Sequence, residues 1–341
     1  MSWLTDDDDA DEPYSEYDET SYKARPNPKA NRPRTKTRPE HGNAVAGRVL
    51  TVDRGRYGVL VDEGGADEHA LTAARARELG KKSVVTGDVV DLVGDTSGAE
   101  GSLARIVRLQ ERSTLLRRSA DDTDAVERVI VANADQMLIV VAAANPEPRP
   151  RLVDRYLVAA YDAGITPLLV VTKTDIADPT SFLANFAGLG LTVFTSNLGD
   201  PPLDEIARAL DGHRTVAVGH SGVGKSTLVN ALVPGADRAI GHVNVVTGRG
   251  RHTSSSTVSL KVPTGGWIID TPGVRSFGLG HINPDNILRA FTDLAEIAED
   301  CPRGCTHLPD APDCAIAEAV EAGKASRERY DSAQRLLTTL A

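Results

Sequence analysis

The stretch GHSGVGKST, residues 219–227, has the spacing GxxxxGK[ST] of a phosphate-binding loop. In such a loop, backbone N–H groups surround the β- and γ-phosphates of a nucleotide at a helix N-terminus. Lys225 is expected to act on these phosphates as a catalytic cation, and Ser226 to bind Mg²⁺ through its hydroxyl. The predicted nucleotide-binding residues of this loop are Gly219, Ser221, Gly222, Val223, Gly224, Lys225, Ser226 and Thr227.

The flanking sequence supplies the elements that such a loop needs. RTVAVG before it is a short apolar run typical of a strand, and KSTLVNALV from its last residues onward has the apolar spacing of a helix. The alternative is a glycine- and serine-rich turn with an accidental lysine. That alternative does not account for strand, loop and helix occurring in this order.

A second motif, TKTD at residues 172–175, follows the apolar run PLLVV and is a candidate reader of the base. A carboxylate at Asp175 would accept two hydrogen bonds from N1–H and the 2-amino group of guanine, whereas adenine offers neither donor. Lys173 would lie along the base, and Thr172 stands where asparagine is usual. Ser196, in the stretch FTSN, is expected in a second loop behind the base. A solvated Lys/Asp pair at a strand end is the alternative.

A third motif, DTPG at residues 270–273, ends the apolar run WIID. Asp270 suits a carboxylate that holds Mg²⁺ through water, and Gly273 would bring its N–H to the γ-phosphate. Val274 follows, where Ras-like enzymes carry the glutamine that orients the attacking water. An aliphatic side chain cannot orient water, so this role must be filled from elsewhere in the chain or by a partner.

The order of the motifs is unusual. The base reader precedes the phosphate-binding loop, whereas GTPases ordinarily begin with that loop and end with the base reader. The same strands joined in another order form a circular permutation, which is tolerated where the original termini lie close together at the surface.

The chain has three cysteines, and all fall in CPRGCTHLPDAPDC, residues 301–314. Its start is acidic and has no signal peptide, which predicts a reducing, cytoplasmic location and argues against a disulfide. Three thiolates and one imidazole form a closed tetrahedral zinc site of the structural kind. The predicted ligands are Cys301, Cys305, His307 and Cys314. Free thiols, a disulfide, or another ligand in place of His307 are the alternatives.

Two further regions precede the base reader. Short β-type runs alternate with Gly and Asp turns over about residues 44–110, which predicts a small antiparallel barrel or sandwich. Basic residues cluster where the chain leaves this region, and they either bind RNA or form a solvated rim. They are Arg105, Arg108, Arg112, Arg117 and Arg118. Tyr57 is its single aromatic residue, so backbone contacts are favoured over base stacking. The first forty residues are an acidic and then a basic block without a core-forming pattern, which predicts disorder.

Together these blocks resemble the circularly permuted ribosome-assembly GTPases of the RsgA (YjeQ) family. The resemblance covers about residues 44–340 and rests on VANADQMLIV, LVDRYLVAA, TKTD, GHSGVGKST, GRGRHTSSS, DTPGVRSFG and the cysteine cluster. It implies a multidomain α/β protein: an OB-fold barrel over 44–112, a permuted P-loop GTPase core over 113–280, and a helical zinc-binding domain over 281–341. The tail over 1–43 is predicted from composition alone and lies outside the resemblance.

The resemblance also implies GTP hydrolysis that the small ribosomal subunit and its rRNA stimulate, late in that subunit's maturation. GRGRHTSSS reads as a mobile switch, in which His252 is the candidate that orients water and Thr253 the second hydroxyl on Mg²⁺, beside Ser226 and Asp270. His252 could instead only contact phosphate or RNA. We expect a monomer that exchanges GTP and GDP and has no membrane partner.

Composition constrains the partners. The 341 residues have a formal net charge of −10, so RNA contacts must use local basic patches, and no apolar run is long enough for a membrane span. A GTPase and a nucleotide-gated rRNA-binding module with little turnover both fit, and Val274 keeps the second open. An ATP-using kinase fits less well because Asp175 favours guanine.

Overall fold

The computed structural model describes residues 41–80, 82–119, 127–235, 257–271, 277, 279–280 and 282–340. Residues 1–40 of the predicted tail and the predicted site residues His252, Thr253 and Gly273 lie outside these ranges, as does Val274. In the described ranges no helix is long and apolar enough to cross a bilayer.

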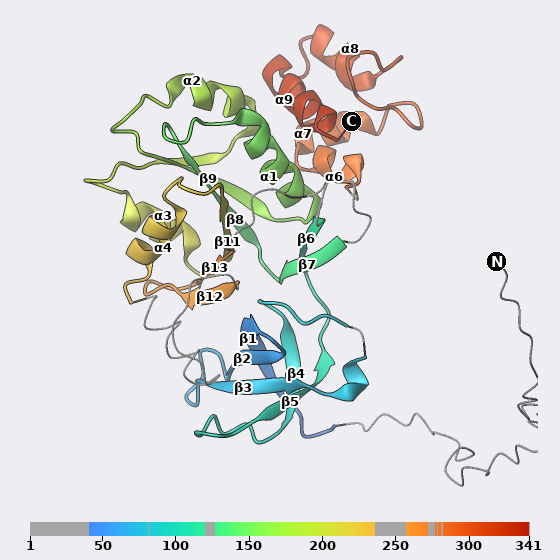
Figure 1. The fold of residues 1–341 in the computed structure, drawn as a ribbon. Coiled ribbons are helices and arrows are strands. Elements are labelled where there is room, and N and C mark those ends of the chain that lie inside the picture. Colours follow the sequence, from blue (N-terminus) through green and yellow to red (C-terminus); the bar gives the residue numbers. More distant parts are fainter. Residues whose placement is uncertain are drawn as a thin grey trace, which may run out of the picture. The chain divides into compact units, whose positions relative to one another are not determined.

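The first five strands form a closed barrel (Figure 1). They are β1 (Val45–Asp53), β2 (Arg56–Val61), β3 (His69–Arg75), β4 (Val89–Gly94) and β5 (Ala104–Leu109), with a short 3₁₀ turn, η2 (Arg77–Leu79), after β3. Strand β1 pairs with both β2 and β4, and β3 pairs with β5, which closes the sheet. The expected small barrel is therefore present. Strand β3 was not expected, because HALTAAR has little of the β-branched character that marked the other four.

A hairpin of β6 (Leu115–Ser119) and β7 (Glu127–Ala132) leads from the barrel to the nucleotide-binding core. The core sheet has the order β10-β9-β8-β11-β13-β12, parallel except for β12. Its strands are β8 (Gln136–Ala142), β9 (Thr166–Thr172), β10 (Thr192–Thr195), β11 (Arg214–Gly219), β12 (Val258–Lys261) and β13 (Trp267–Asp270). Its helices are α1 (Pro150–Asp162), α2 (Thr180–Leu183), the 3₁₀ helix η3 (Ala184–Leu189), α3 (Leu203–Leu210) and α4 (Lys225–Leu232).

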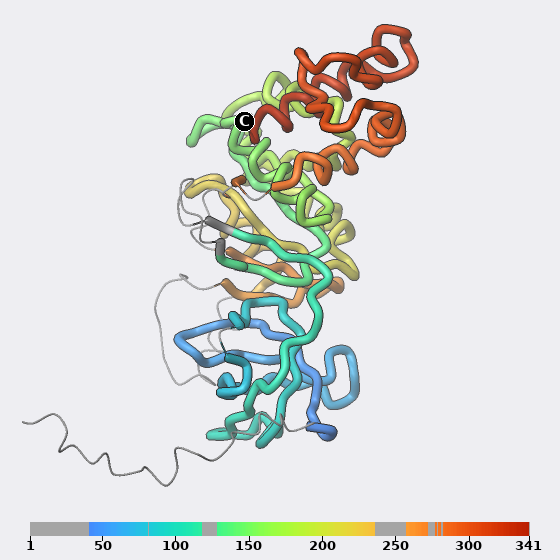
Figure 2. The backbone as a smooth tube through the Cα atoms, turned by 90° about the vertical axis from the view of Figure 1, so that its right-hand side faces the viewer, coloured from blue at the N-terminus to red at the C-terminus, as the bar shows by residue number. Residues whose placement is uncertain are grey.

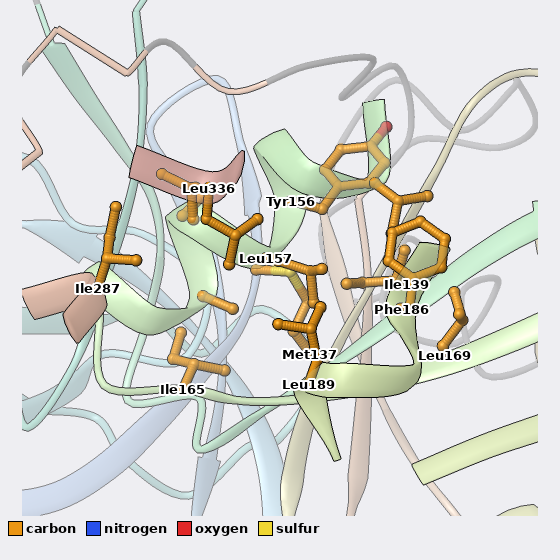
Figure 3. Close-up of a cluster of buried hydrophobic side chains, with 14 of the residues drawn as sticks. Met137, Ile139, Tyr156, Leu157, Ile165, Leu169, Phe186, Leu189, Ile287 and Leu336 are labelled. Atoms are coloured by element: carbon orange, nitrogen blue, oxygen red, sulfur yellow. The ribbon is translucent and has the colours of Figure 1, made fainter. Parts of the chain in front are cut away.

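Both faces of the core sheet are covered, as in other parallel sheets. Met137 and Ile139 of β8 belong to the cluster that contains α1 and the C-terminal helices, drawn in Figure 3. The intervening Leu138 and Val140 belong to a second cluster with α3 and α4. This alternation explains why β8 reads as a continuous apolar run in the sequence, because every side chain of the strand is buried.

The C-terminal region is helical. Its helices are α6 (Pro284–Arg289), α7 (Thr292–Ala298), α8 (Ala315–Glu321) and α9 (Arg327–Thr338), shown in orange and red in Figure 2. Helices α8 and α9 are separated by a short turn that contains Gly323. Ile287, Leu294 and Leu336 from these helices are fully buried in the cluster that α1 also enters.

The barrel is joined to the core sheet by hydrogen bonds. Thr51 of β1 pairs with Val258 of β12, so one sheet runs through both regions. Glu63, from the β2–β3 connection, accepts hydrogen bonds from Arg48 Nε at 2.7 Å and from Trp267 Nε1 at 2.7 Å, and Arg214 approaches it at 3.6 Å. Burial raises the pKa of the Glu63 carboxyl, but these neighbours outweigh burial and the pKa lies below 4.5. Glu63 therefore stays ionised at this junction.

Candidate nucleotide site and metal centre

The phosphate-binding loop lies where the sequence places it, between the end of β11 and the start of α4. Strand β11 is central, with β8 on one side and β13 on the other, so the loop opens at the carboxyl edge of the parallel sheet. Gly224 adopts a φ of +92°, a left-handed backbone conformation that residues other than glycine rarely adopt. Val223 is buried in the second core cluster, so its side chain anchors the loop, whereas Ser221, Ser226 and Thr227 are exposed.

Lys225 and Asp270 form an ion pair across this edge. Asp270 ends β13, the neighbour of β11, and both side chains are largely buried, with 11% and 15% exposed. The next residue, Thr271, donates a hydrogen bond from Oγ1 to the carbonyl oxygen of Ala217 at 2.8 Å, which fixes the start of the DTPG segment against β11. The carboxylate of Asp270 thus pairs with the ammonium group that is predicted to contact the phosphates.

The base-reading motif contacts the phosphate-binding loop directly. Thr172 is buried, and its hydroxyl lies 2.5 Å from the carbonyl oxygen of Val223 and 3.1 Å from that of Val141. Lys173 reaches the carbonyl oxygen of Gly222 with Nζ at 2.8 Å, and also that of Asn145. The lysine therefore ties the two loops together, a role that sequence spacing alone did not indicate.

A pocket of about 140 Å³ opens between these loops, on the side where a base would follow the phosphates. Five residues from the predicted set line it, namely Thr172, Lys173, Ser196, Gly224 and Thr227, together with Asn197, Leu198, Pro201, Leu228 and Ala231. Leu198 is 82% exposed, and sequence reasoning missed it because FTSN stops one residue earlier. Asp175 is exposed and does not line this pocket, so the guanine contact assigned to it stays a prediction.

The four predicted zinc ligands are brought together. One ligand atom from each of Cys301, Cys305, His307 and Cys314 lies within 4.8 Å of the others. His307 Nδ1 is 3.7 Å from Cys301 Sγ and 3.8 Å from Cys314 Sγ. Zn–S and Zn–N bonds in a tetrahedron place two ligand atoms about 3.5–3.8 Å apart, so the spacing fits zinc.

The chemistry of the cluster also fits a divalent cation. Burial lowers the pKa of His307, which keeps the imidazole neutral as a metal ligand must be. Burial, followed by the neighbouring thiols Cys314 and Cys301, raises the pKa of Cys305 to about 11. Thiolates in this position repel one another unless a cation neutralises them.

The barrel arginines are not equivalent. Arg112 forms a two-pronged ion pair with Asp88, with Nε–Oδ1 at 2.6 Å and Nη2–Oδ2 at 2.8 Å, and the carboxylate is fully buried. Arg112 therefore supports the barrel's structure, and neither alternative given above, RNA binding or a solvated rim, describes it. Arg105 is exposed, and Arg108 is exposed but paired with Asp91 at 3.0 Å. Tyr57 is buried at 4% exposure, so it cannot stack on a base.

Known proteins resemble this chain along most of its length. The family model described as RsgA GTPase matches residues 109–280. The Small ribosomal subunit biogenesis GTPase RsgA of Pseudomonas aeruginosa is 36% identical over 307 residues, covering 88% of this chain and 86% of the relative. The protein with the same name from Ectopseudomonas mendocina is 38% identical over 267 residues, covering 76% and 75%.

Two solved structures have the same fold. YjeQ from Thermotoga maritima has a TM-score of 0.63 at 24% identity and covers 87% of this chain and 98% of its own. YloQ, described as a circularly permuted GTPase, has a TM-score of 0.63 at 24% identity and covers 88% and 96%. The order of base reader, phosphate-binding loop and DTPG in this chain agrees with the description of YloQ as circularly permuted. On its identity to the curated relatives and its match to the family model, the chain belongs to the RsgA GTPase family.

Proposed function

We propose that this GTPase hydrolyses GTP to GDP and phosphate with Mg²⁺, when it is bound to the small ribosomal subunit at a late step of that subunit's assembly. The observation that carries the proposal is the convergence of three motifs at one sheet edge. Thr172 and Lys173 touch the loop that precedes Lys225, and Lys225 pairs with Asp270. The curated relatives are named small ribosomal subunit biogenesis GTPases, which supports the partner.

Different residues of the chain would bind the phosphates, the base, Mg²⁺ and the attacking water. The loop N–H groups and Lys225 would hold the β- and γ-phosphates, and Asp175 would select guanine. Ser226, Thr253 and Asp270 would hold Mg²⁺, which supplies charge neutralisation on the phosphate oxygens. His252 would orient the water that attacks the γ-phosphorus, and Gly273 would contact the γ-phosphate. Because Lys225 is paired with Asp270, nucleotide entry must first separate that pair.

The cluster Cys301, Cys305, His307 and Cys314 would hold one zinc ion, which would stabilise the C-terminal fold without taking part in hydrolysis. Arg105 and other exposed cations would meet rRNA at its phosphates, since Tyr57 is buried and Arg112 is occupied. We place the protein in the cytoplasm as a monomer, where small subunits are assembled. Family membership favours turnover over a binding module that merely responds to nucleotide.

The test is the steady-state rate of phosphate release from GTP, with ATP as the control nucleotide, with and without purified small ribosomal subunits. We expect subunits to raise the GTP rate by at least about tenfold, with His252→Ala losing that increase while GDP affinity is kept. A rate that stays flat with subunits present, although GTP binds, would contradict the proposal.

A further inference from the structure

The segment between the two base-reading loops is held by the C-terminal helix α9. This segment leaves the sheet at Thr172 and Lys173, passes through α2 and η3, and returns along β10 to Ser196. Its two ends are bonded to each other: Ser196 N–H donates to the carbonyl oxygen of Val171 at 2.8 Å, and Thr174 N–H to that of Ser196 at 3.3 Å. The two loops are therefore joined to each other, and η3 lies in the chain between them.

Helix α9 lies directly on η3. A Cβ atom added at Gly188 would come within 2.5 Å of the carbonyl oxygen of Glu328 and within 2.7 Å of Ser332 Oγ, so the two backbones are in close contact there. Phe186 and Leu189 of η3 and Leu336 of α9 belong to one buried cluster, of which Figure 3 draws part. The principal neighbours of η3 are thus two helices: α2, which runs directly into η3, and α9.

Two arginines of α9 fasten it to the carbonyl groups of η3. Arg335 donates from Nη1 to the carbonyl oxygen of Asn185, and its guanidinium lies 5.2 Å from the centre of the Phe186 ring. It also pairs with Asp154 of α1, a carboxylate with 3% exposure, at 3.1 Å. Arg329 donates from Nη1 to the carbonyl oxygen of Gly188 at 3.3 Å.

Arg329 is itself held in place. Its guanidinium pairs with Asp293 of α7 at 2.8 Å and lies 5.3 Å from the centre of the Phe291 ring. A guanidinium that stacks on a ring and donates to a carbonyl oxygen has one preferred orientation, since its donors form a rigid plane. Because these guanidinium groups have fixed orientations, the contacts from α9 fix the position of η3.

The other side of α9 contacts the cluster of Cys301, Cys305, His307 and Cys314. The carbonyl oxygen of His307 accepts hydrogen bonds from Tyr330 at 3.3 Å and from Gln334 at 3.1 Å. Tyr330 also lies 3.8 Å from Cys314 Sγ. Helix α9 is thus packed between the cluster and η3.

We propose that α9 is a positioning element for base selection: through Arg335 and the close packing at Gly188 it sets η3, and thereby the TKTD loop and the loop at Ser196, in the arrangement that reads guanine. This inference rests on the proposed function, because it concerns the same nucleotide site. Arg335 acts through η3 and is a positioning residue, and it does not touch the nucleotide.

The experiment compares GDP with IDP, which lacks the 2-amino group of guanine. The dissociation constant of each is measured by competition with a fluorescent guanine nucleotide, and the quantity of interest is the ratio Kd(IDP)/Kd(GDP). Loss of folded protein lowers the binding of both nucleotides together and leaves this ratio unchanged. A displacement of the two base-reading loops, by contrast, lowers the ratio Kd(IDP)/Kd(GDP).

The variants are Gly188→Ala and Arg335→Lys. The first adds only a methyl group at the closest contact, and the second keeps a cation beside Asp154 but lacks the planar group that reaches Asn185 and stacks on Phe186. Matched controls are Gly42→Ala, where nothing lies within 4 Å of an added Cβ, and Arg327→Lys, an exposed arginine of the same helix. Thermal denaturation of each variant verifies folding.

We expect the parent protein to prefer GDP by at least about tenfold, the effect of one hydrogen bond to a charged acceptor. Both α9–η3 variants are expected to lower the ratio by about threefold or more, with both controls at the parent value. Unchanged ratios in both variants overturn the inference while the base reading proposed for the parent stands. A parent protein that binds GDP and IDP equally overturns the base reading itself and, with it, the inference.

Discussion

The hydroxyl of Thr172 lies 2.5 Å from the carbonyl oxygen of Val223, so the first residue of the base-reading motif is bonded to the phosphate-binding loop. Asparagine is usual at this place in the motif, and its longer side chain would also need a partner there. Threonine reaches the carbonyl because the end of β9 passes close to the loop: Thr172 Oγ1 is 3.6 Å from the position of a Cβ on Gly224. Threonine at position 172 thus keeps the base-reading motif connected to the phosphate-binding loop.

Thr172→Val should weaken nucleotide binding. Valine has nearly the same shape but no hydroxyl, and leaving the buried carbonyl oxygens without that donor costs about 1–3 kcal/mol. We expect the Kd for GDP to rise about tenfold, measured by titration calorimetry. Thr172→Ser keeps the hydroxyl and is the matched control, with an expected change of less than about threefold. Wild-type affinity in the valine variant would show that the bond does not support the site.

Asp270→Asn should change binding and turnover in opposite directions. Asparagine removes the carboxylate that pairs with Lys225, so the ammonium becomes free for phosphates. Without Mg²⁺, the affinity for GDP should rise by about threefold or more, because no ion pair has to be broken. With Mg²⁺ and small subunits, phosphate release should fall by at least about tenfold, because a metal-holding carboxylate is lost. A decrease in both quantities would mean that the ion pair does not compete with nucleotide.

Removal of the metal should unfold the C-terminal region. Zinc contributes about 10–16 kcal/mol to the folding of small zinc-binding peptides, and this cluster links α8 to the loop before it. We expect one zinc per chain by mass spectrometry of the metal. We also expect a Tm several degrees lower after chelation or in Cys305→Ser. Asp310→Asn, an exposed carboxylate in the same loop, is the control and should keep the metal. A Cys305→Ser chain with full zinc content would contradict the ligand set.

Glu63→Gln should loosen the junction between the barrel and the core sheet in a pH-dependent manner. Arg48, Arg214 and Trp267 hold the pKa of Glu63 below 4.5 in the folded protein, although burial acts in the other direction. A carboxyl with a depressed pKa stabilises the fold above its unfolded pKa, and this stabilisation is lost as the pH falls through the folded value.

We therefore expect the free energy of unfolding of Glu63→Gln, measured in urea, to be lower than that of the parent by about 1–3 kcal/mol at pH 7. The difference should shrink below pH 4.5. Glu111→Gln, at an exposed glutamate, is the control. A difference that does not change with pH would assign the effect of the substitution to packing instead of charge.

The sequence by itself determined the elements whose signals are local. A phosphate-binding loop needs its glycines, lysine and hydroxyl at adjacent positions, so GHSGVGKST predicted a strand, a loop and a helix at β11 and α4. Closely spaced cysteines and a histidine predicted for the same reason that these four side chains lie together. The order of the motifs predicted the permutation, because chain order is itself a property of the sequence.

The tertiary structure alone decided which side chains are available and what holds the loops in place. Arg112 could be told from Arg105 only through its contact with Asp88, and no sequence pattern marked Glu63 as the partner of Trp267. The contact of Gly188 with α9 joins residues that are far apart in the chain. Such contacts depend on how whole elements pack against each other. A local pattern of residue types records only which face of an element is apolar and leaves its neighbour undefined.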